Sequence, residues 1–265
     1  MDYLQIDNLI VDGVSLSLTF KGGESVGFIG DNKTIEKIFL YLSGVNNSKG
    51  RVLFNGKDVF DNDNYFKSRI IIDFKKRYIT TLKKESISEA FKNKFDISVD
   101  MEKMVRHVKE FSLRKEAIFD VKYTFTEFGN TLLNYSLVDA ISVDRMFLIN
   151  PLYKVEDSKL KEKLIKGLIS KKYKNLFIEV NDIYSCKMLD YYVFLDKGEA
   201  KVVSCDSEVY LYQKGASLTP LLEKGDYLVS LEKREEHSLF SKKFYKRMKF
   251  KDALIALEGD SNEKE

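Results

Sequence analysis

Apolar and polar residues alternate along the first twenty positions of the chain. Leu4, Ile6 and Leu9 are apolar between mostly polar neighbours, and the same pattern returns from Val14 to Phe20. A period of two is typical of a β-strand with one buried face. The pattern therefore predicts two neighbouring strands with a turn at Gly13 between them.

The next segment changes period. A compact apolar run from Ser25 to Ile29 ends at Gly30, and apolar residues then recur at helical spacing from Thr34 to Ser43. Gly44 follows at once, and glycine is a common residue just past the end of a helix. We therefore expect a strand, a glycine turn and a helix in that order.

Later segments alternate between strands and helices. Short apolar runs predict strands at 51–54, 70–72, 146–149, 176–180, 191–195, 201–204 and 227–231, whereas helical periodicity predicts a mainly helical stretch at 86–144 and helices at 157–170 and 250–257. Such alternation is typical of an α/β sheet with crossover connections. We expect a main domain over 1–205 with a helical insertion at about 76–144, and a small C-terminal extension over 206–265.

Composition narrows the class of protein. The chain has 265 residues, of which 44% are hydrophobic and 32% are charged, and its formal net charge is only +3. This balance does not predict a nucleic-acid partner. The chain has only two cysteines and two histidines, which argues against a structural metal, and no apolar run reaches the roughly 18 to 20 residues of a membrane span. We expect a soluble, intracellular protein without a metal site.

The strand, turn and helix at 25–43 lie where a phosphate-binding loop would be expected. That loop has the sequence G-x-x-x-x-G-K-[ST], whose backbone N–H groups and lysine hold phosphates and whose hydroxyl holds magnesium. Only its first glycine, Gly30, is present here. Ile35 takes the place of the second glycine, Glu36 that of the lysine and Lys37 that of the hydroxyl residue.

At this point the chain resembles the nucleotide-binding subunit of ABC transporters. The resemblance rests on short matches that keep the family's order over about 250 residues, at 23–30, 42–44, 50, 55–59, 147–151, 181–182, 190, 197–198 and 250–259. The last match resembles subunits of the ABC-2 export class. The resemblance implies an ABC-type P-loop NTPase-like core, with a mixed sheet and flanking helices, a helical subdomain and an N-terminal antiparallel β-subdomain.

The positions that carry chemistry in this family differ here. Ile149 stands where the resemblance places a magnesium-binding aspartate, Asn150 where it places the catalytic glutamate, and Asn181 where it places the histidine switch. The family's glutamine falls near Lys75 or Lys76. The signature-like segment consists of four residues, Glu127, Phe128, Gly129 and Asn130.

These departures predict a pseudo-ATPase, that is, a protein that is not an enzyme and needs no cofactor. Replacing lysine by Glu36 changes the charge beside a polyanion by two units, and Asn150 cannot act as a general base. Weak, vestigial nucleotide binding is expected at five residues, Gly30, Asn32, Lys33, Thr34 and Lys37. The alternative is a working ATPase subunit of an ABC exporter, which would bind ATP and Mg²⁺ and use Lys33 or Lys37 in a shifted loop.

The resemblance also implies partners. We expect an integral membrane protein to dock in the groove between the core and the helical subdomain, at about 75–120, and the chain to form a homodimer or heterodimer with an ABC-type subunit at the inner face of the cell membrane. A second alternative is a soluble scaffold dimer without a membrane partner. The basic run from Ser241 to Lys251 is either a solvated face or a contact with phospholipid headgroups or an acidic partner.

Overall fold

The fold is built on a ten-stranded mixed sheet. The computed structural model describes residues 2–46, 50–78, 84–113, 126–171, 173–196, 198–213, 220–231 and 244–259. The strands of the main sheet lie in the order β5-β4-β1-β2-β10-β9-β3-β8-β7-β6. Their bounds are β1 (Tyr3–Val11), β2 (Val14–Lys21), β3 (Glu24–Ile29), β4 (Arg51–Phe54), β5 (Lys57–Asp58), β6 (Arg69–Asp73), β7 (Arg145–Ile149), β8 (Asn175–Glu179), β9 (Tyr191–Asp196) and β10 (Glu199–Ser204).

The sheet has a parallel part and an antiparallel part. Strands β6, β7, β8, β3 and β9 pair in parallel, whereas β1, β2, β4 and β5 pair antiparallel. Strand β10 joins the two parts, since it pairs antiparallel with β9 and touches β2 in parallel through Glu199 and Ser15. This arrangement confirms the predicted mixed sheet with an antiparallel N-terminal part.

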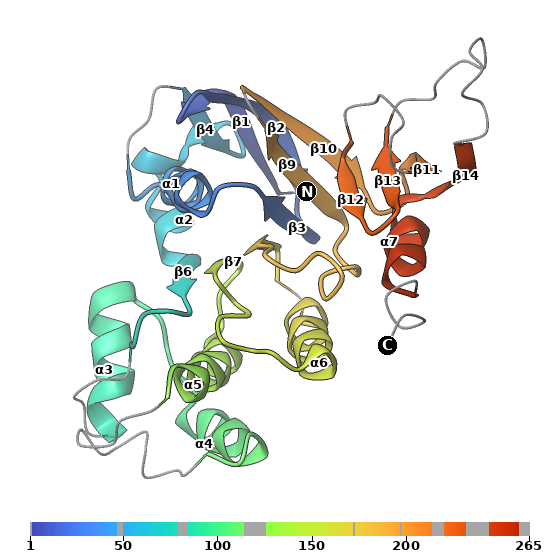
Figure 1. Cartoon of the computed structure of the whole chain (residues 1–265). Coiled ribbons are helices and arrows are strands. Elements are labelled where there is room, and N and C mark those ends of the chain that lie inside the picture. The colour runs from blue at the N-terminus through green and yellow to red at the C-terminus, as the bar shows by residue number, and fades with distance from the viewer. Residues whose placement is uncertain are drawn as a thin grey trace.

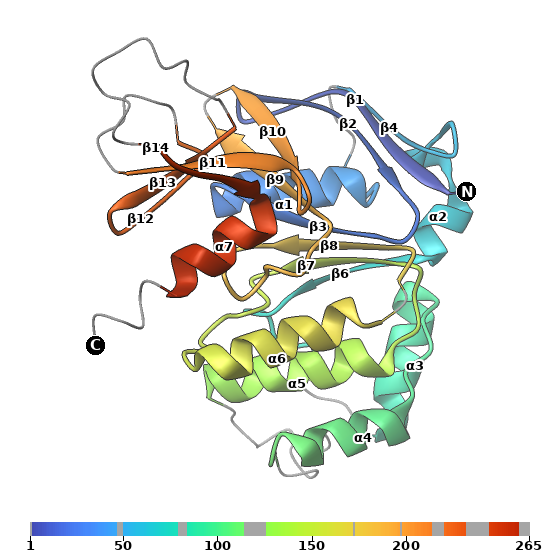
Figure 2. The same ribbon diagram turned by 90° about the vertical axis from the view of Figure 1, so that its right-hand side faces the viewer.

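Helices cover both faces of the sheet. Helix α1 lies on one face and α5 and α6 on the other, and α3 and α4 extend beyond α5 (Figures 1 and 2). The helical bounds are α1 (Asn32–Leu42), the short 3₁₀ helix η1 (Val59–Asp61), α2 (Asp63–Lys67), α3 (Lys84–Phe95), α4 (Met101–Glu110), α5 (Glu127–Ala140) and α6 (Ser158–Ile169). Helices α3, α4 and α5 fall within the predicted helical insertion.

Each face has its own apolar core, and strand alternation explains why. In β7, Phe147 and Ile149 pack in the cluster under α1, whereas Met146 and Leu148 pack in the cluster with α5 and α6. Successive strand residues point to opposite faces, so a strand covered on both sides is apolar throughout. Ile35 belongs to α1 and is fully buried, so it is one of the residues by which this helix packs on the sheet.

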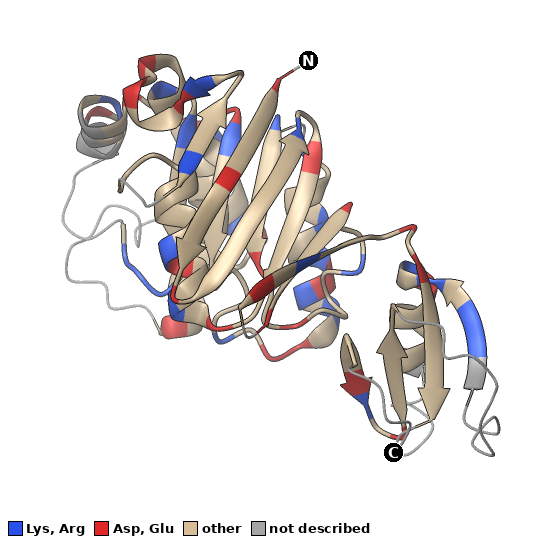
Figure 3. Ribbon diagram, turned by 90° about the horizontal axis from the view of Figure 1, so that it is seen from above, with Lys and Arg blue, Asp and Glu red and all other residues tan. Residues whose placement is uncertain are grey.

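A second, smaller sheet follows the main one and lies to one side of it (Figures 1 and 3). Its strand order is β12-β13-β11-β14, and helix α7 packs on it. The bounds are β11 (Glu208–Gln213), β12 (Leu222–Lys224), β13 (Tyr227–Ser230), β14 (Phe244–Lys249) and α7 (Phe250–Gly259). The sequence predicted only β13 and α7 of these five elements.

None of the helices in the described residues is long and apolar enough to cross a lipid bilayer.

Candidate functional site

The turn between β3 and α1 is shaped by packing and closed by its own carboxylate. Gly30 has a φ of 154°, and a Cβ there would lie 2.8 Å from the Cβ of Leu195, so only glycine fits. Asp31 caps α1 because its carboxylate accepts the backbone N–H of Thr34 at 2.9 Å. The Thr34 N–H and hydroxyl hold the pKa of Asp31 below its ordinary value. An internal carboxylate thus already lies at this helix N-terminus.

A pocket of about 560 Å³ opens beside this turn. Six of the residues predicted for the nucleotide site line it, together with a segment at the end of β6. The six predicted residues are Gly30, Asn32, Lys33, Glu36, Ile149 and Asn150. The other three lining residues are Asp31, Asp73 and Lys75. The structure therefore brings the Gly30 turn, the start of α1 and the end of β7 together, as the resemblance implied.

Two predicted residues point elsewhere. Thr34 donates its hydroxyl to Asp12 at 3.1 Å, and Lys37 forms an ion pair with the same carboxylate. Asp12 lies in the turn between β1 and β2, and neither Thr34 nor Lys37 lines the pocket. A carboxylate from the neighbouring hairpin therefore holds both side chains, and the structure does not bring Thr34 and Lys37 into the pocket with the other predicted residues.

The charges of the pocket are mixed. Lys33 and Lys75 supply two ammonium groups, whereas Asp31, Glu36 and Asp73 supply three carboxylates. Lys76 lies next to the pocket, 3.9 Å from Glu36 and 3.6 Å from Asp73, and partly neutralises them. Among the described residues no group of three or more histidine, cysteine, aspartate or glutamate side chains is placed to hold a metal ion.

Behind the pocket lies a buried carboxyl group that the sequence reasoning missed. Glu179, at the end of β8, is 1% exposed, and its Oε2 accepts the backbone N–H of Asn150 at 2.7 Å. Burial raises the pKa of Glu179 to about 7, although the Asn150 N–H and the nearby Lys75 oppose the rise. The available signal was a lone charge in the otherwise apolar run Leu176–Val180.

Asn150 and Asn181, at two of the positions that depart from the family, lie side by side. The Asn181 amide donates to Oδ1 of Asn150 at 3.5 Å. Asn150 adopts a left-handed conformation with a φ of 51°, which asparagine tolerates better than most residues. The structure therefore links the ends of β7 and β8 through two amides and the Glu179 carboxylate.

The signature-like residues begin helix α5, and they do not line the pocket. Thr126 caps this helix through the Gly129 N–H, and Glu127 accepts the hydroxyl of Tyr153 at 2.8 Å. Phe128 is 39% exposed, whereas Asn130 is buried and donates to the carbonyls of Phe74 and Lys76. Within one chain, the start of α5 thus contacts the segment after β6 but does not line the pocket.

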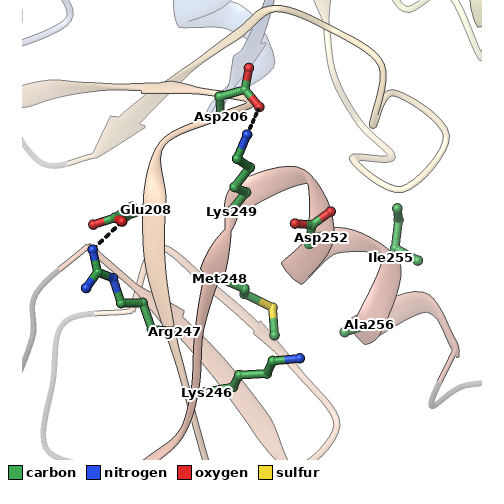
Figure 4. Close-up of a pocket in the computed structure, with 9 residues that line it drawn as sticks. All are labelled: Asp206, Glu208, Lys246, Arg247, Met248, Lys249, Asp252, Ile255 and Ala256. Carbon is green, nitrogen blue, oxygen red and sulfur yellow. Dashed lines mark hydrogen bonds and ion pairs between the residues drawn. The ribbon is translucent and has the colours of Figure 1, made fainter.

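The basic run lies in the second sheet. Its first three residues fall outside the described part of the chain, and the rest form β14 and the start of α7. Arg247 pairs with Glu208, and Lys249 and Lys251 pair with Asp206, beside a pocket between β14 and α7 (Figure 4). Three of the basic groups are thus engaged within the chain.

Comparison with known proteins identifies the fold. No protein-family model and no curated protein sequence matches the chain. Many solved structures do match, and two of them follow. The chain is similar to CbiO1 from Clostridium perfringens, a part of the ABC transporter complex CbiONQ, with 15% identity, a TM-score of 0.54, and coverage of 76% of this chain and 88% of that one.

The other structure is the ATP-binding cassette MJ0796, in a dimeric post-hydrolysis state bound to ADP and Pi. It is 14% identical with a TM-score of 0.57, over 76% of this chain and 98% of that one. The chain therefore has the α/β fold of ABC-type ATPases, as predicted.

The same structures correct two predictions. The proteins that share this fold are ABC ATPases, and one of them holds the products of ATP hydrolysis, so the prediction that the chain is not an enzyme was wrong. The expectation that the chain needs no cofactor is unsupported as well, because it followed from the prediction that the chain is not an enzyme. ATP with Mg²⁺, the alternative drawn from the sequence, fits these structures.

Proposed function

We propose that the chain is the ATP-binding-cassette subunit of an ABC-type membrane complex, with its nucleotide site in the pocket beside Gly30. The observation that supports this proposal is the meeting of the β3–α1 turn, the end of β6 and the end of β7 around one pocket on this fold. Ligands of open α/β sheets bind at the carboxyl ends of the strands.

The residues of the pocket fit a nucleotide in a modified way. Lys33 and Lys75 provide positive charge for phosphate oxygens, and the amides of Asn32 and Asn150 provide hydrogen-bond donors. Magnesium bound to the triphosphate would supply the further positive charge that the missing motif lysine does not. Because three carboxylates share the pocket, we infer weaker nucleotide binding and slower turnover than the motif residues of the family would give.

Glu36 is the residue that sets this affinity. Two unit charges at about 4 Å interact by about 4 kcal/mol at an effective dielectric constant of about 20. The Glu36 side chain is 43% exposed, so water screens much of this repulsion. We therefore expect Glu36→Gln to tighten the binding of ATP with Mg²⁺ by about tenfold, which is about 1.4 kcal/mol.

Calorimetric titration with ATP and Mg²⁺, followed by a phosphate-release assay, tests the proposal. Wild type, Glu36→Gln and Glu36→Lys are compared, and Glu156→Gln, at an exposed position on the loop before α6, is the matched control. The two Glu36 variants should bind more tightly than wild type, in the order Lys above Gln, and the control should not. Absence of binding by all four proteins at millimolar ATP would refute the nucleotide site.

The partner surface belongs to the same proposal. Helices α3, α4 and α5 form the helical part on which we propose that a membrane-embedded subunit docks, with the chain at the cytoplasmic face of the membrane. The start of α5, which does not line the pocket of its own chain, would complete the site of a second ABC-type subunit in a homodimer or heterodimer. The match of 250–259 to export-class subunits makes an exporter the kind of complex that we propose.

A further inference from the structure

An acidic side chain interrupts one of the two strands of the main sheet that are buried at every residue, β7 and β8. Strand β8 is buried along its whole length, and Glu179 is its only ionisable residue. Alternation along the strand places Glu179 on the same face as Phe177, which packs in the cluster under α1. The carboxyl group therefore lies on the face of the sheet where the pocket opens.

The two oxygens of Glu179 have different surroundings. Oε2 accepts the backbone N–H of Asn150, a residue that lines the pocket. Oε1 is buried and has no hydrogen-bond partner. An ionised carboxylate with an unsatisfied oxygen is costly in a buried site, and the protonated acid costs less because it carries no charge. The geometry thus favours a group that exchanges a proton.

The neighbouring strand ends supply few charges to oppose this exchange. The charged neighbours of Glu179 are Asp73 at the end of β6 and Lys75 just after it, and they act in opposite directions on its pKa. The residue paired with it in β3 is Phe28, and the neighbours after β7 and β8 are the neutral Asn150 and Asn181. Burial therefore dominates the environment of the carboxyl group.

We propose that Glu179 is the proton-binding group of the pocket, and that an anionic ligand and a proton bind there together. This inference rests on the proposed nucleotide site, and it assigns to that site a regulation by pH. Glu179 acts as a positioning residue, because it holds the backbone of Asn150 and does not itself line the pocket.

The sign of the effect follows from electrostatics. A bound polyphosphate near the pocket disfavours the ionised form of Glu179 and so raises its pKa further above 7. Binding at pH 8 then takes up a proton, whereas binding at pH 6 does not, because the group is already protonated. Each pKa unit of coupling changes the affinity by up to about tenfold, so we expect ATP with Mg²⁺ to bind several-fold more tightly at pH 6 than at pH 8.5.

The test is calorimetry of ATP with Mg²⁺ at pH 6 and pH 8.5, and at pH 7.5 in buffers of different ionisation enthalpy. Glu179→Gln keeps an acceptor oxygen for the Asn150 N–H but cannot titrate, and Glu36→Gln removes a second carboxylate from the same pocket. We expect proton uptake by wild type and Glu36→Gln, and none by Glu179→Gln. Equal proton uptake by wild type and Glu179→Gln would overturn the assignment and leave the nucleotide site intact.

A ligand-free measurement separates this inference from the proposed function. The amide proton shift of Asn150, followed by NMR from pH 5 to pH 9, should show a step near pH 7 in wild type that is lost in Glu179→Gln. Such a step without any nucleotide binding would support the proton site and refute the nucleotide site. The absence of the step would overturn the inference whatever the calorimetry shows.

Discussion

The buried carboxyl of Glu179 also makes a prediction for the stability of the folded chain. Its pKa rises from an ordinary 4.5 to about 7 on folding, so the folded state keeps a proton that the unfolded state loses. Stability falls with pH wherever the folded state binds more protons than the unfolded state. The contribution of this group is therefore fully present below pH 4.5 and is lost as the pH rises through 7.

The expected magnitude follows from the two pKa values. One pKa unit is worth about 1.4 kcal/mol, so integrating between pH 5 and pH 8 gives a loss of about 2 to 3 kcal/mol from this single group. Glu179→Gln removes the titration and keeps the hydrogen bond with Asn150. The free energy of unfolding of the variant, relative to wild type, should thus increase by about 2 to 3 kcal/mol from pH 5 to pH 8.

Urea unfolding at the two pH values, monitored by circular dichroism, measures this difference. Glu156→Gln controls for the loss of one negative charge from the molecule at an exposed position. A difference between Glu179→Gln and wild type that is the same at pH 5 and pH 8 would refute the reasoning, because it would mean that Glu179 is ionised in both states at pH 5 already.

Two further predictions concern packing and docking. A Cβ at Gly27 would lie 2.7 Å from Val180 and 2.8 Å from Leu189, so Gly27→Ala should destabilise the chain by about 1–3 kcal/mol in thermal unfolding. Gly167 lies in α6, and a Cβ there would have no atom within 4 Å, so Gly167→Ala should leave stability unchanged or raise it by up to about 1 kcal/mol. Equal losses of stability in the two variants would contradict the packing argument. For docking, the tagged chain purified from detergent-solubilised native membranes should carry an integral membrane protein. Arg106→Glu on the exposed side of α4 should reduce the recovery of that protein, whereas Lys166→Glu on α6 should not.

Most of the fold could be predicted because strand and helix periods are strong in the main domain. The second sheet was harder, since β14 carries the basic run and was interpreted as a solvated face or a partner contact. In the structure Arg247 lies opposite Tyr210 and pairs with Glu208 on the neighbouring strand. Cross-strand partners of this kind cannot be inferred from one strand alone.

The site was predictable only in part for a related reason. Spacing relative to Gly30 located Lys33 and Glu36, and the apolar strand before Asn150 located the other wall of the pocket. The contact of Lys37 with Asp12 could not be inferred from local spacing, because Asp12 comes from a hairpin 25 residues earlier. A single buried charge such as Glu179 has no periodicity, so only its neighbours in the folded chain show its environment.

Two asparagines of α5 couple the segment after β6 to this helix. Asn130 and Asn134 both donate to the carbonyls of Phe74 and Lys76, which fastens this stretch of backbone to the helix. Lys76 in turn reaches Glu36 on α1. A rotation of the helical part would therefore move this backbone segment, and with it the Lys75 side chain that lines the pocket and the Lys76 side chain beside it.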